Sequence, residues 1–327
     1  MKKPENVKPN LADIRRAAQA LREGKLVAFP TETVYGLGAD ASNPDAVRHV
    51  FALKGRPTNH PLILHIADAK SLAKWARDIP EAAHSLAKAF MPGPLSLVLK
   101  RSAFVSDLIT GGQDTVAIRI PAHPTALALL SEFGGGIVAP SANRFGRISP
   151  TRAEHVRADF PTGIAQILDG GACDYGLEST ILDMTGDKAR VLRPGALGQV
   201  DLAEVLGYTP ELSKKPKVKV SGSLASHYAP ITPTSVTALE AIPNETTTGV
   251  LAREEKPAQF KGIWTTMPKD VKSYAQTLYA ALRELDTQAV KHIYIEDLPS
   301  EDAWLAIKDR VTRASHNTKE SLAHVKQ

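Results

Sequence analysis

The amino-acid sequence predicts an α/β protein with two domains. Short apolar runs alternate with stretches of helical periodicity along most of the chain, which is the pattern of strands and helices packed in layers. The runs between residues 165 and 193 follow one another through turn residues, so the main sheet is predicted to be mixed and twisted rather than purely parallel. At 327 residues, the chain exceeds the usual size of one compact core, which favours a large domain followed by a smaller one.

The first predicted helix spans residues 10–22, because Asn10 is a typical helix cap and Ile14, Ala17 and Leu21 recur at helical spacing. Strands are predicted at 25–29, 62–66, 95–100, 116–120, 137–139, 165–168, 179–183 and 190–192. Further helices are predicted at 44–53, 69–77, 81–90, 123–132 and 152–159.

The composition changes after Gly207. Residues 208–220 contain two prolines and four lysines with no sustained period, which indicates an exposed linker. We therefore predict a first domain at 1–207, a linker at 208–230 and a small α/β domain at 231–327. The small domain is expected to alternate strands at 249–252, 262–265 and 292–295 with helices at 269–285 and 301–315.

The overall composition favours a folded protein of the cytoplasm. Hydrophobic residues make up 43% of the chain and charged residues 23%, and no run of about 18 apolar residues predicts a membrane span or export. The single cysteine, Cys173, cannot form an internal disulfide and is predicted to be buried without a chemical role. The net charge of +5 suits a polyanionic partner, either a phosphate-bearing ligand or RNA.

Four polar segments follow apparent strands, where α/β folds place ligands. The first, residues 29–40, contains hydroxyls, a carboxylate and two glycines, and its alternative interpretation is a capped turn. The second carries Lys54 and Arg56, which in an extended segment would project to one side and grip a phosphate chain. The alternative for this pair is two solvated surface cations. His65 follows within an apolar run, as either a core residue or a ligand group.

The third segment places Arg119 in the apolar body of a strand, where an unpaired charge would be costly. Its partner is either a bound carboxylate or an internal Asp or Glu. The fourth segment, residues 138–151, gathers Ser141, Asn143 and Ser149, which is more hydrogen-bonding capacity than a plain turn needs. The sequence contains none of the common nucleotide, zinc or serine-hydrolase motifs, so phosphate would have to be bound in another way.

Taken together, these segments resemble the YrdC-type threonylcarbamoyl-AMP synthase family. The resemblance covers residues 10–205 and rests on seven segments in order: FPTETVYGLGADA, KGRP with PLILHI, MPGPLSLVL, DTVAIRIPAHP, APSANRFGRISPT, GLESTI and VLRPG. The two-domain branch of the family adds a linker that ends in His-Tyr-Ala-Pro and a small Rossmann-like domain, and residues 227–230 match that linker element. Residues 221–224 read Ser-Gly-Ser-Leu where the branch usually has Ser-Pro-Gly-Met.

The resemblance implies a YrdC-like concave site and a reaction in two stages. The amine of L-threonine captures bicarbonate as a carbamate, and the carbamate oxygen then attacks the α-phosphate of ATP and expels pyrophosphate. Matching residue by residue assigns catalysis to Lys54, Arg56, Ser141 and Asn143, and threonine binding to Thr33, His65, Arg119, Ala139 and Ser179. The same matching assigns ATP binding to Lys54, Arg56, His60, Thr115, Ser141, Asn143, Ser149, Arg193, His227 and Tyr228.

The resemblance also implies that Mg²⁺ arrives on the ATP phosphates, with no metal site built by the protein, and that the product serves the machinery that transfers threonylcarbamoyl to tRNA. The main alternative is an RNA-binding module of the same fold, but only 6% of the residues are aromatic and stacking patches are lacking. Weak RNA contact is compatible with the mild basic charge. A second alternative, carbamoyl transfer as in hydrogenase maturation, belongs to much larger chains with additional segments.

Overall fold

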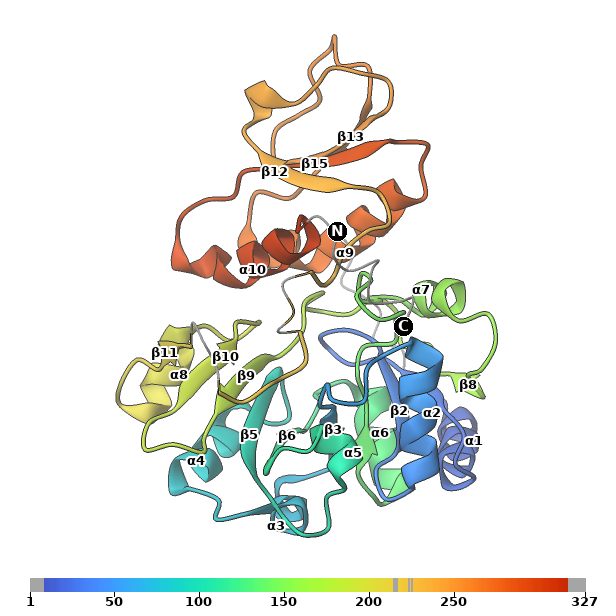
Figure 1. Ribbon diagram of the computed structural model, residues 1–327, viewed down its shortest axis with the longest axis vertical. Helices are drawn as coiled ribbons and strands as arrows, with labels where there is room; N and C mark the ends of the chain where they lie inside the picture. The colour runs from blue at the N-terminus through green and yellow to red at the C-terminus, as the bar shows by residue number, and fades with distance from the viewer. Residues whose placement is uncertain (1–8, 214–216, 223, 225, 317–327) are drawn as a thin grey trace. The chain divides into compact units, whose positions relative to one another are not determined.

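The computed structural model describes residues 9–213, 217–222, 224 and 226–316, and its contacts divide the chain into two compact units (Figure 1). The first unit comprises residues 1–145 and 150–222, and the second comprises 146–149 and 223–327. The division falls inside the segment 208–230 predicted as a linker, so each unit holds part of that segment.

The first unit is built on one large sheet with the strand order β11-β10-β9-β5-β6-β3-β7-β2-β1-β8, and β4 pairs with β5. Some neighbours are parallel, such as β3 with β6 and β5 with β9, whereas others are antiparallel, such as β5 with β6, so the prediction of a mixed sheet is confirmed. The strands are β1 (Val27–Phe29), β2 (Gly36–Asp40), β3 (Ile63–His65), β4 (Ala76–Arg77), β5 (Leu95–Arg101), β6 (Thr115–Arg119), β7 (Ile137–Val138), β8 (Gln166–Ile167), β9 (Thr180–Asp183), β10 (Arg190–Arg193) and β11 (Glu211–Leu212).

The helices of this unit largely begin where sequence signals place them. Asn10 caps the first helix by accepting hydrogen bonds from the backbone N–H groups of Ala12 and Asp13. The helix predicted at 69–77 is wrong in its last two residues, because Ala76 and Arg77 pair with β5 as a short strand. The helices are α1 (Leu11–Arg22), α2 (Pro44–Lys54), α3 (Leu72–Trp75) after a 3-10 turn at Ala69–Ser71, α4 (Glu81–Phe90), α5 (Asp107–Thr110), α6 (Pro124–Phe133), α7 (Ala153–Asp159) and α8 (Gln199–Leu206).

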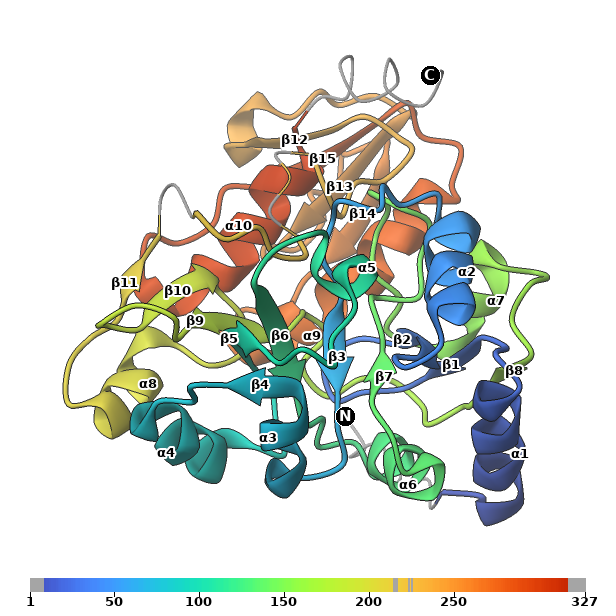
Figure 2. The ribbon, with the colours of Figure 1, turned by 60° about the horizontal axis from the view of Figure 1, so that its bottom comes forward.

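Side chains alternate along each strand, so the sheet has two faces, and different helices cover each of them. On one face, which we call the site face, Val27, Phe29 and Ile137 pack against α1 and α6, which lie side by side in Figure 2. The opposite face packs against α2 and α4. Further along the site face, β3, β5 and β9 carry a small apolar cluster that the helices leave uncovered. It consists of Ile63, Val98 and Ile181 of these strands, and Val220 of the predicted linker packs against them.

Strand β2 was not predicted, because two of its five residues are glycines, which are uncommon in strands. A Cβ added at Gly38 would lie 2.8 Å from Cε1 of Phe29 and 3.0 Å from Cγ2 of Ile137. The strand therefore requires glycine for its packing between β1 and β7, although glycine has a low strand propensity. Helix α8 and the short strands β11 and β12 were also not predicted.

The second unit contains a four-stranded sheet with the order β12-β15-β13-β14, in which neighbouring strands are parallel. Its elements are β12 (Thr234–Thr237), β13 (Thr248–Ala252), β14 (Ile263–Thr266), α9 (Val271–Asp286), β15 (His292–Glu296) and α10 (Leu305–Ala314), with 3-10 turns at Leu239–Ala241 and Asp302–Trp304. The predicted small Rossmann-like α/β domain is confirmed. Among the described residues, no helix combines the length and apolarity that a membrane crossing requires.

Candidate active site

Polar side chains gather on the site face where α1 and α6 do not cover it. Alternation along β6 places Thr115 and Arg119 on this face, and the register of β3 against β6 pairs His65 with Arg119. Ser96 of β5 and Ser179, which precedes β9, project from the same face because β5 and β9 pair in parallel. Four residues from distant segments that the sequence assigned to substrate are therefore brought to one surface.

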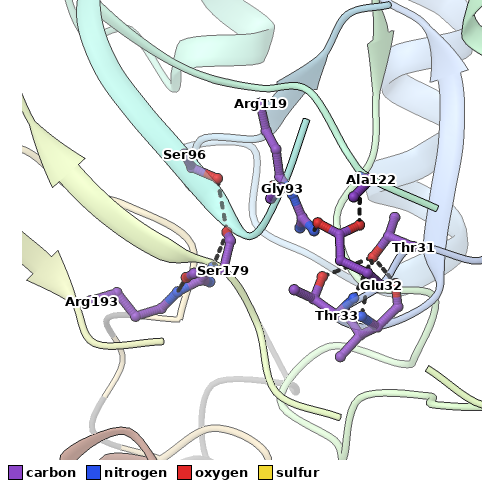
Figure 3. Close-up of polar contacts among 10 residues, drawn as sticks. Thr31, Glu32, Thr33, Gly93, Ser96, Arg119, Ala122, Ser179 and Arg193 are labelled. Carbon is purple, nitrogen blue, oxygen red and sulfur yellow. Dashed lines mark hydrogen bonds and ion pairs between the residues drawn. The ribbon is translucent and has the colours of Figure 1, made fainter. Parts of the chain in front are cut away.

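Arg119 has an internal partner, Glu32, which lies in the loop after β1 (Figure 3). Nη2 of Arg119 donates to Oε1 of Glu32 at 2.7 Å, and Nε donates to the carbonyl of Gly93 at 3.2 Å. The second oxygen of Glu32 accepts the N–H of Ala122 at 2.9 Å. The Nη1 group of Arg119 makes no hydrogen bond within the described residues. The internal pair therefore forms and still leaves donors on the guanidinium for a carboxylate ligand.

The loop that carries Glu32 is ordered by its two threonines. The Thr31 hydroxyl donates to the carbonyl of Val34 at 2.6 Å and lies 2.8 Å from the Thr33 hydroxyl. It also accepts the N–H groups of Thr33 and Val34, which makes a compact hydroxyl-capped turn. Both threonines are buried, so Thr33 is held beside Glu32 rather than exposed on the surface.

His65 is buried and neutral at ordinary pH. Its ring meets Phe29 edge-on at 6.2 Å between ring centroids. Burial, assisted by the nearby positive charge of Arg119, lowers the pKa of His65 to about 3. Nδ1 has no hydrogen-bond partner within the described part of the chain. A buried polar atom of this kind next to Arg119 is suited to a ligand contact.

Lys54 lies in the last turn of α2, which ends because Gly55 adopts the left-handed conformation with φ of 66°. The predicted extended geometry for Lys54 and Arg56 is therefore wrong, since a helix end and a turn separate them. Nζ of Lys54 donates to the backbone carbonyls of Ser141, at 2.6 Å, and Asn143. Burial, and secondarily the charge of Arg56, holds the pKa of Lys54 well below its ordinary value. The interpretation of this residue as a solvated surface cation is excluded.

Arg56 is also buried and is held by the loop that follows it. Its Nη2 donates to the carbonyl of Pro61 at 2.8 Å, and Nε donates to that of His60 at 3.3 Å. The guanidinium lies 5.6 Å from the ring centroid of Phe145, which the His60 ring also meets edge-on. Burial, with the charge of Arg56, lowers the pKa of His60 to about 4.

Arg193, at the end of β10, joins the site through Ser179. Its Nη2 donates to the carbonyl of Ser179 at 2.8 Å and to its hydroxyl at 3.0 Å (Figure 3). The Ser179 hydroxyl lies 2.8 Å from that of Ser96. Ala139, the first residue after β7, is buried and donates its N–H to the carbonyl of Ile63 at 3.0 Å, which fixes it beside β3.

Comparison with known proteins identifies the family. The family model described as "Telomere recombination", for Sua5, YciO and YrdC, matches residues 19–195. The model described as "Threonylcarbamoyl-AMP synthase, C-terminal domain" matches residues 197–316. The chain belongs to the Sua5–YciO–YrdC family.

Two relatives and one solved structure match along nearly the whole chain. Threonylcarbamoyl-AMP synthase of Pyrococcus abyssi is 42% identical and covers 92% of this chain and 94% of its own, and that of Bacillus subtilis is 40% identical with 94% of each covered. The crystal structure of P. abyssi Sua5 complexed with L-threonine matches with a TM-score of 0.85 and 39% identity, over 94% of this chain and 95% of that one. The chain therefore has the two-domain organisation of this branch of the Sua5–YciO–YrdC family.

The remaining residues assigned to ATP, namely Ser149, His227 and Tyr228, lie in the second unit. Tyr228 is buried with φ of 60°, and its ring stacks on Tyr279 at 5.8 Å between centroids while the guanidinium of Arg310 lies 5.1 Å from it. Ser149 closes the segment 146–149, where Gly146 accepts the N–H of Ala229 at 3.0 Å. Their contact with a nucleotide stays a prediction.

Sequence reasoning missed two members of the site network, Glu32 and Ser96. Glu32 lies in the first polar segment, and its carboxylate within an otherwise hydroxyl-rich loop was the signal that could have paired it with Arg119. Ser96 lies inside an apolar strand, where a polar residue on the face of Val98 indicates a partner across the sheet. Cys173 is buried, as predicted, and burial raises the pKa of its thiol well above the ordinary value.

Proposed function

We propose that this protein is a nucleotidyltransferase that forms L-threonylcarbamoyl-adenylate and pyrophosphate from L-threonine, bicarbonate and ATP. The single observation that supports this best is the buried contact of Lys54 with the carbonyls of Ser141 and Asn143, which joins the two motifs assigned to ATP. Similarity to the relatives from P. abyssi and B. subtilis, both named threonylcarbamoyl-AMP synthase, gives independent support.

Threonine would bind on the site face beside β3 and β6. The free Nη1 donors of Arg119 suit its carboxylate, and the neutral ring of His65 together with Thr33 suits its polar side chain and amine. Ala139 and Ser179 complete the set that the family resemblance assigns to threonine. The complex of P. abyssi Sua5 with L-threonine supports threonine as a ligand of this protein by similarity.

ATP would bind next to threonine, with its phosphates facing Lys54, Arg56, Ser141 and Asn143. The amine of threonine adds to bicarbonate with loss of water, and an oxygen of the resulting carbamate attacks the α-phosphorus. The bond from this phosphorus to the bridging oxygen breaks, and pyrophosphate leaves with the electron pair. Positive groups fixed before the reaction would stabilise the charge that moves onto the leaving group.

Additional ATP contacts are proposed for His60, Thr115, Ser149, Arg193, His227 and Tyr228, as the family resemblance implies. Mg²⁺ is proposed to enter bound to the ATP phosphates, as part of the substrate. Among the described residues no group of three or more His, Cys, Asp or Glu side chains could hold a metal ion, whereas Lys54 and Arg56 carry N–H donors, which suit phosphate oxygens. The product is proposed to serve threonylcarbamoyladenosine modification of tRNA in the cytoplasm.

The test is an incubation of the pure protein with ATP, bicarbonate, Mg²⁺ and labelled threonine, followed by detection of pyrophosphate and a labelled adenylate. Pyrophosphate release that does not depend on threonine would refute the proposal. The variants Lys54→Ala and Arg56→Ala should abolish turnover while the circular dichroism spectrum stays native. Near-normal rates in both variants would show that these cations do not face the phosphates.

A further inference from the structure

Residues 217–222, in the middle of the predicted linker, belong to the first unit, and the side chain of Gln113 binds their backbone at Lys219. The Nε2 of Gln113 donates to the carbonyl of Lys219 at 3.0 Å, and its Oε1 accepts the N–H of Lys219 at 2.7 Å. The side-chain amide of Gln113 thus pairs with the backbone of Lys219 as a residue of a neighbouring β-strand would. The next residue, Val220, is 3% exposed and packs into the apolar cluster on the site face. The backbone position of Ser221 is therefore fixed by the residues before it.

Ser221 contacts two arginines that come from different parts of the fold. Its hydroxyl accepts a hydrogen bond from Nη2 of Arg56 at 3.1 Å and donates to the carbonyl of Pro61 at 2.9 Å. Its backbone carbonyl accepts from Nη1 of Arg193 at 3.0 Å. Arg56 and Arg193 are 7% and 4% exposed, so both guanidiniums are held within the protein rather than extended into water. A single serine thus links the loop after α2 to the end of β10.

The hydroxyl and the backbone carbonyl of Ser221 help to fix the orientation of the Arg56 and Arg193 guanidiniums, respectively. Ser179 holds Arg193 along its Nε and Nη2 side, and the carbonyl of Ser221 holds the Nη1 side, so the plane of the guanidinium is fixed from two directions. In Arg56, Nη2 donates both to the carbonyl of Pro61 and to the hydroxyl of Ser221, and Nε donates to the carbonyl of His60. An arginine binds phosphate best when its planar group is already oriented, because less side-chain freedom is lost on binding.

We propose that Ser221 is a positioning residue that sets the orientation of Arg56 and Arg193 toward the phosphates of ATP, and that Gln113 acts through the linker to place Ser221. This inference rests on the proposed function, in which both arginines contact ATP. It assigns a role in nucleotide binding to the middle of the linker, at the serine that begins the segment 221–224, in which the residues after Ser221 depart from the pattern usual in its branch of the family.

The test measures pyrophosphate release by the full-length protein, varying ATP at saturating threonine and bicarbonate, and then threonine at saturating ATP. Because Ser221→Ala removes a hydrogen bond to a charged group, it should raise the KM for ATP about tenfold and change the KM for threonine by less than about twofold. Ser221→Thr keeps the hydroxyl and should restore the KM for ATP. Thr209→Ala removes an exposed hydroxyl from the same predicted linker and is the matched control.

Gln113→Ala provides a second route, because it releases the linker without altering a residue that contacts either arginine. It should raise the KM for ATP in the same direction, and the double variant Gln113→Ala/Ser221→Ala should be no worse than about the product of the single effects, since both act through one segment. An unchanged KM for ATP in a folded Ser221→Ala variant, or a lowered one, would overturn the inference. Equal changes in the KM values for ATP and threonine would also overturn it.

Failure of the inference and failure of the proposed function give different results. An active wild-type protein with an unaffected Ser221→Ala variant refutes only the inference. An inactive wild-type protein refutes the proposed function, and calorimetric titration with MgATP then makes the same comparison without turnover. Weaker MgATP binding by Ser221→Ala than by Thr209→Ala supports the positioning role, whereas equal affinities, or no binding by the wild-type protein, contradict it.

Discussion

The buried pair of Arg119 and Glu32 gives the sharpest prediction of stability. Their side chains are 5% and 3% exposed and lie 2.7 Å apart, so little solvent screens their interaction. Removing one partner of a buried pair leaves the other charge without compensation, which costs about 3–5 kcal/mol. Glu32→Ala is therefore expected to lower the free energy of unfolding of the first unit by about this amount. Glu32→Gln keeps the volume and one acceptor, and a loss of about 1.5–3 kcal/mol is expected.

Urea denaturation followed by tryptophan fluorescence measures these losses. Trp75 reports on the first unit, and Trp264 and Trp304 lie in the second, so a Trp264→Phe/Trp304→Phe background isolates the relevant signal. Glu154→Ala removes the partner of an exposed pair with Arg152 and should cost less than about 1 kcal/mol.

A double-mutant cycle separates the pair from its surroundings. In the combined variant Glu32→Ala/Arg119→Ala, no buried charge is left alone, so its destabilisation should be clearly smaller than the sum of the two single losses. Strict additivity would show that the two groups do not interact in solution. A Glu32→Ala variant within about 1 kcal/mol of the wild-type protein would refute the reasoning altogether.

Three further predictions concern individual residues. Arg119→Ala should raise the KM for threonine far more than the KM for ATP in the pyrophosphate assay, and equal increases would contradict the assignment of its Nη1 donors. Because the pKa of His65 is lowered to about 3 in the folded protein, the unfolded chain binds the proton more readily. Stability should therefore decline as the pH falls from about 6.5 towards 3, by up to about 1.4 kcal/mol per pH unit. His65→Gln should show a shallower decline in urea titrations across this range, and parallel curves would argue against burial of a neutral imidazole. Gly38→Ala should cost about 1–3 kcal/mol through its clash with Phe29, whereas Gly186→Ala, whose added methyl group would lie 3.9 Å from its nearest neighbour, should be within about 0.5 kcal/mol of the wild type in thermal unfolding.

Elements with a clear hydrophobic period could be predicted from the sequence, and those shaped by tertiary packing could not. The helix capped by Asn10 buries Ile14, Ala17 and Leu21 as its spacing indicates. Strand β2 escaped prediction because its glycines are selected by contacts with Phe29 and Ile137, which lie on neighbouring strands. The strand at Ala76–Arg77 likewise exists because β5 provides its partner, while the local sequence favours a continued helix.

The candidate site shows the same division. The sequence requires that Arg119 have an anionic partner and offers a carboxylate in the first polar segment, but nothing in the sequence around Arg119 shows that Glu32, 87 residues away, is that partner. Similarly, a spacing of two residues suggested that Lys54 and Arg56 project together, whereas Gly55 ends a helix between them. The sequence of each segment therefore shows which residues can bind a ligand. Which of these residues meet depends on the order of the strands in the sheet, and the sequence alone does not specify that order.

The segment Gly146–Ser149 pairs with the second unit although the residues on both sides of it belong to the first. Arg147 forms an isolated bridge with Ala229, and Arg283, which donates to the carbonyl of Ile148, follows that residue by 135 positions. A ribosome adds about 5–20 residues per second, starting from the N-terminus, so these four residues emerge well before their partners have been made. The loop that carries Asn143 therefore leads into a stretch whose contacts form only after the chain has been synthesised as far as Arg283, and a chain that stalls before Arg283 would lack one of these contacts.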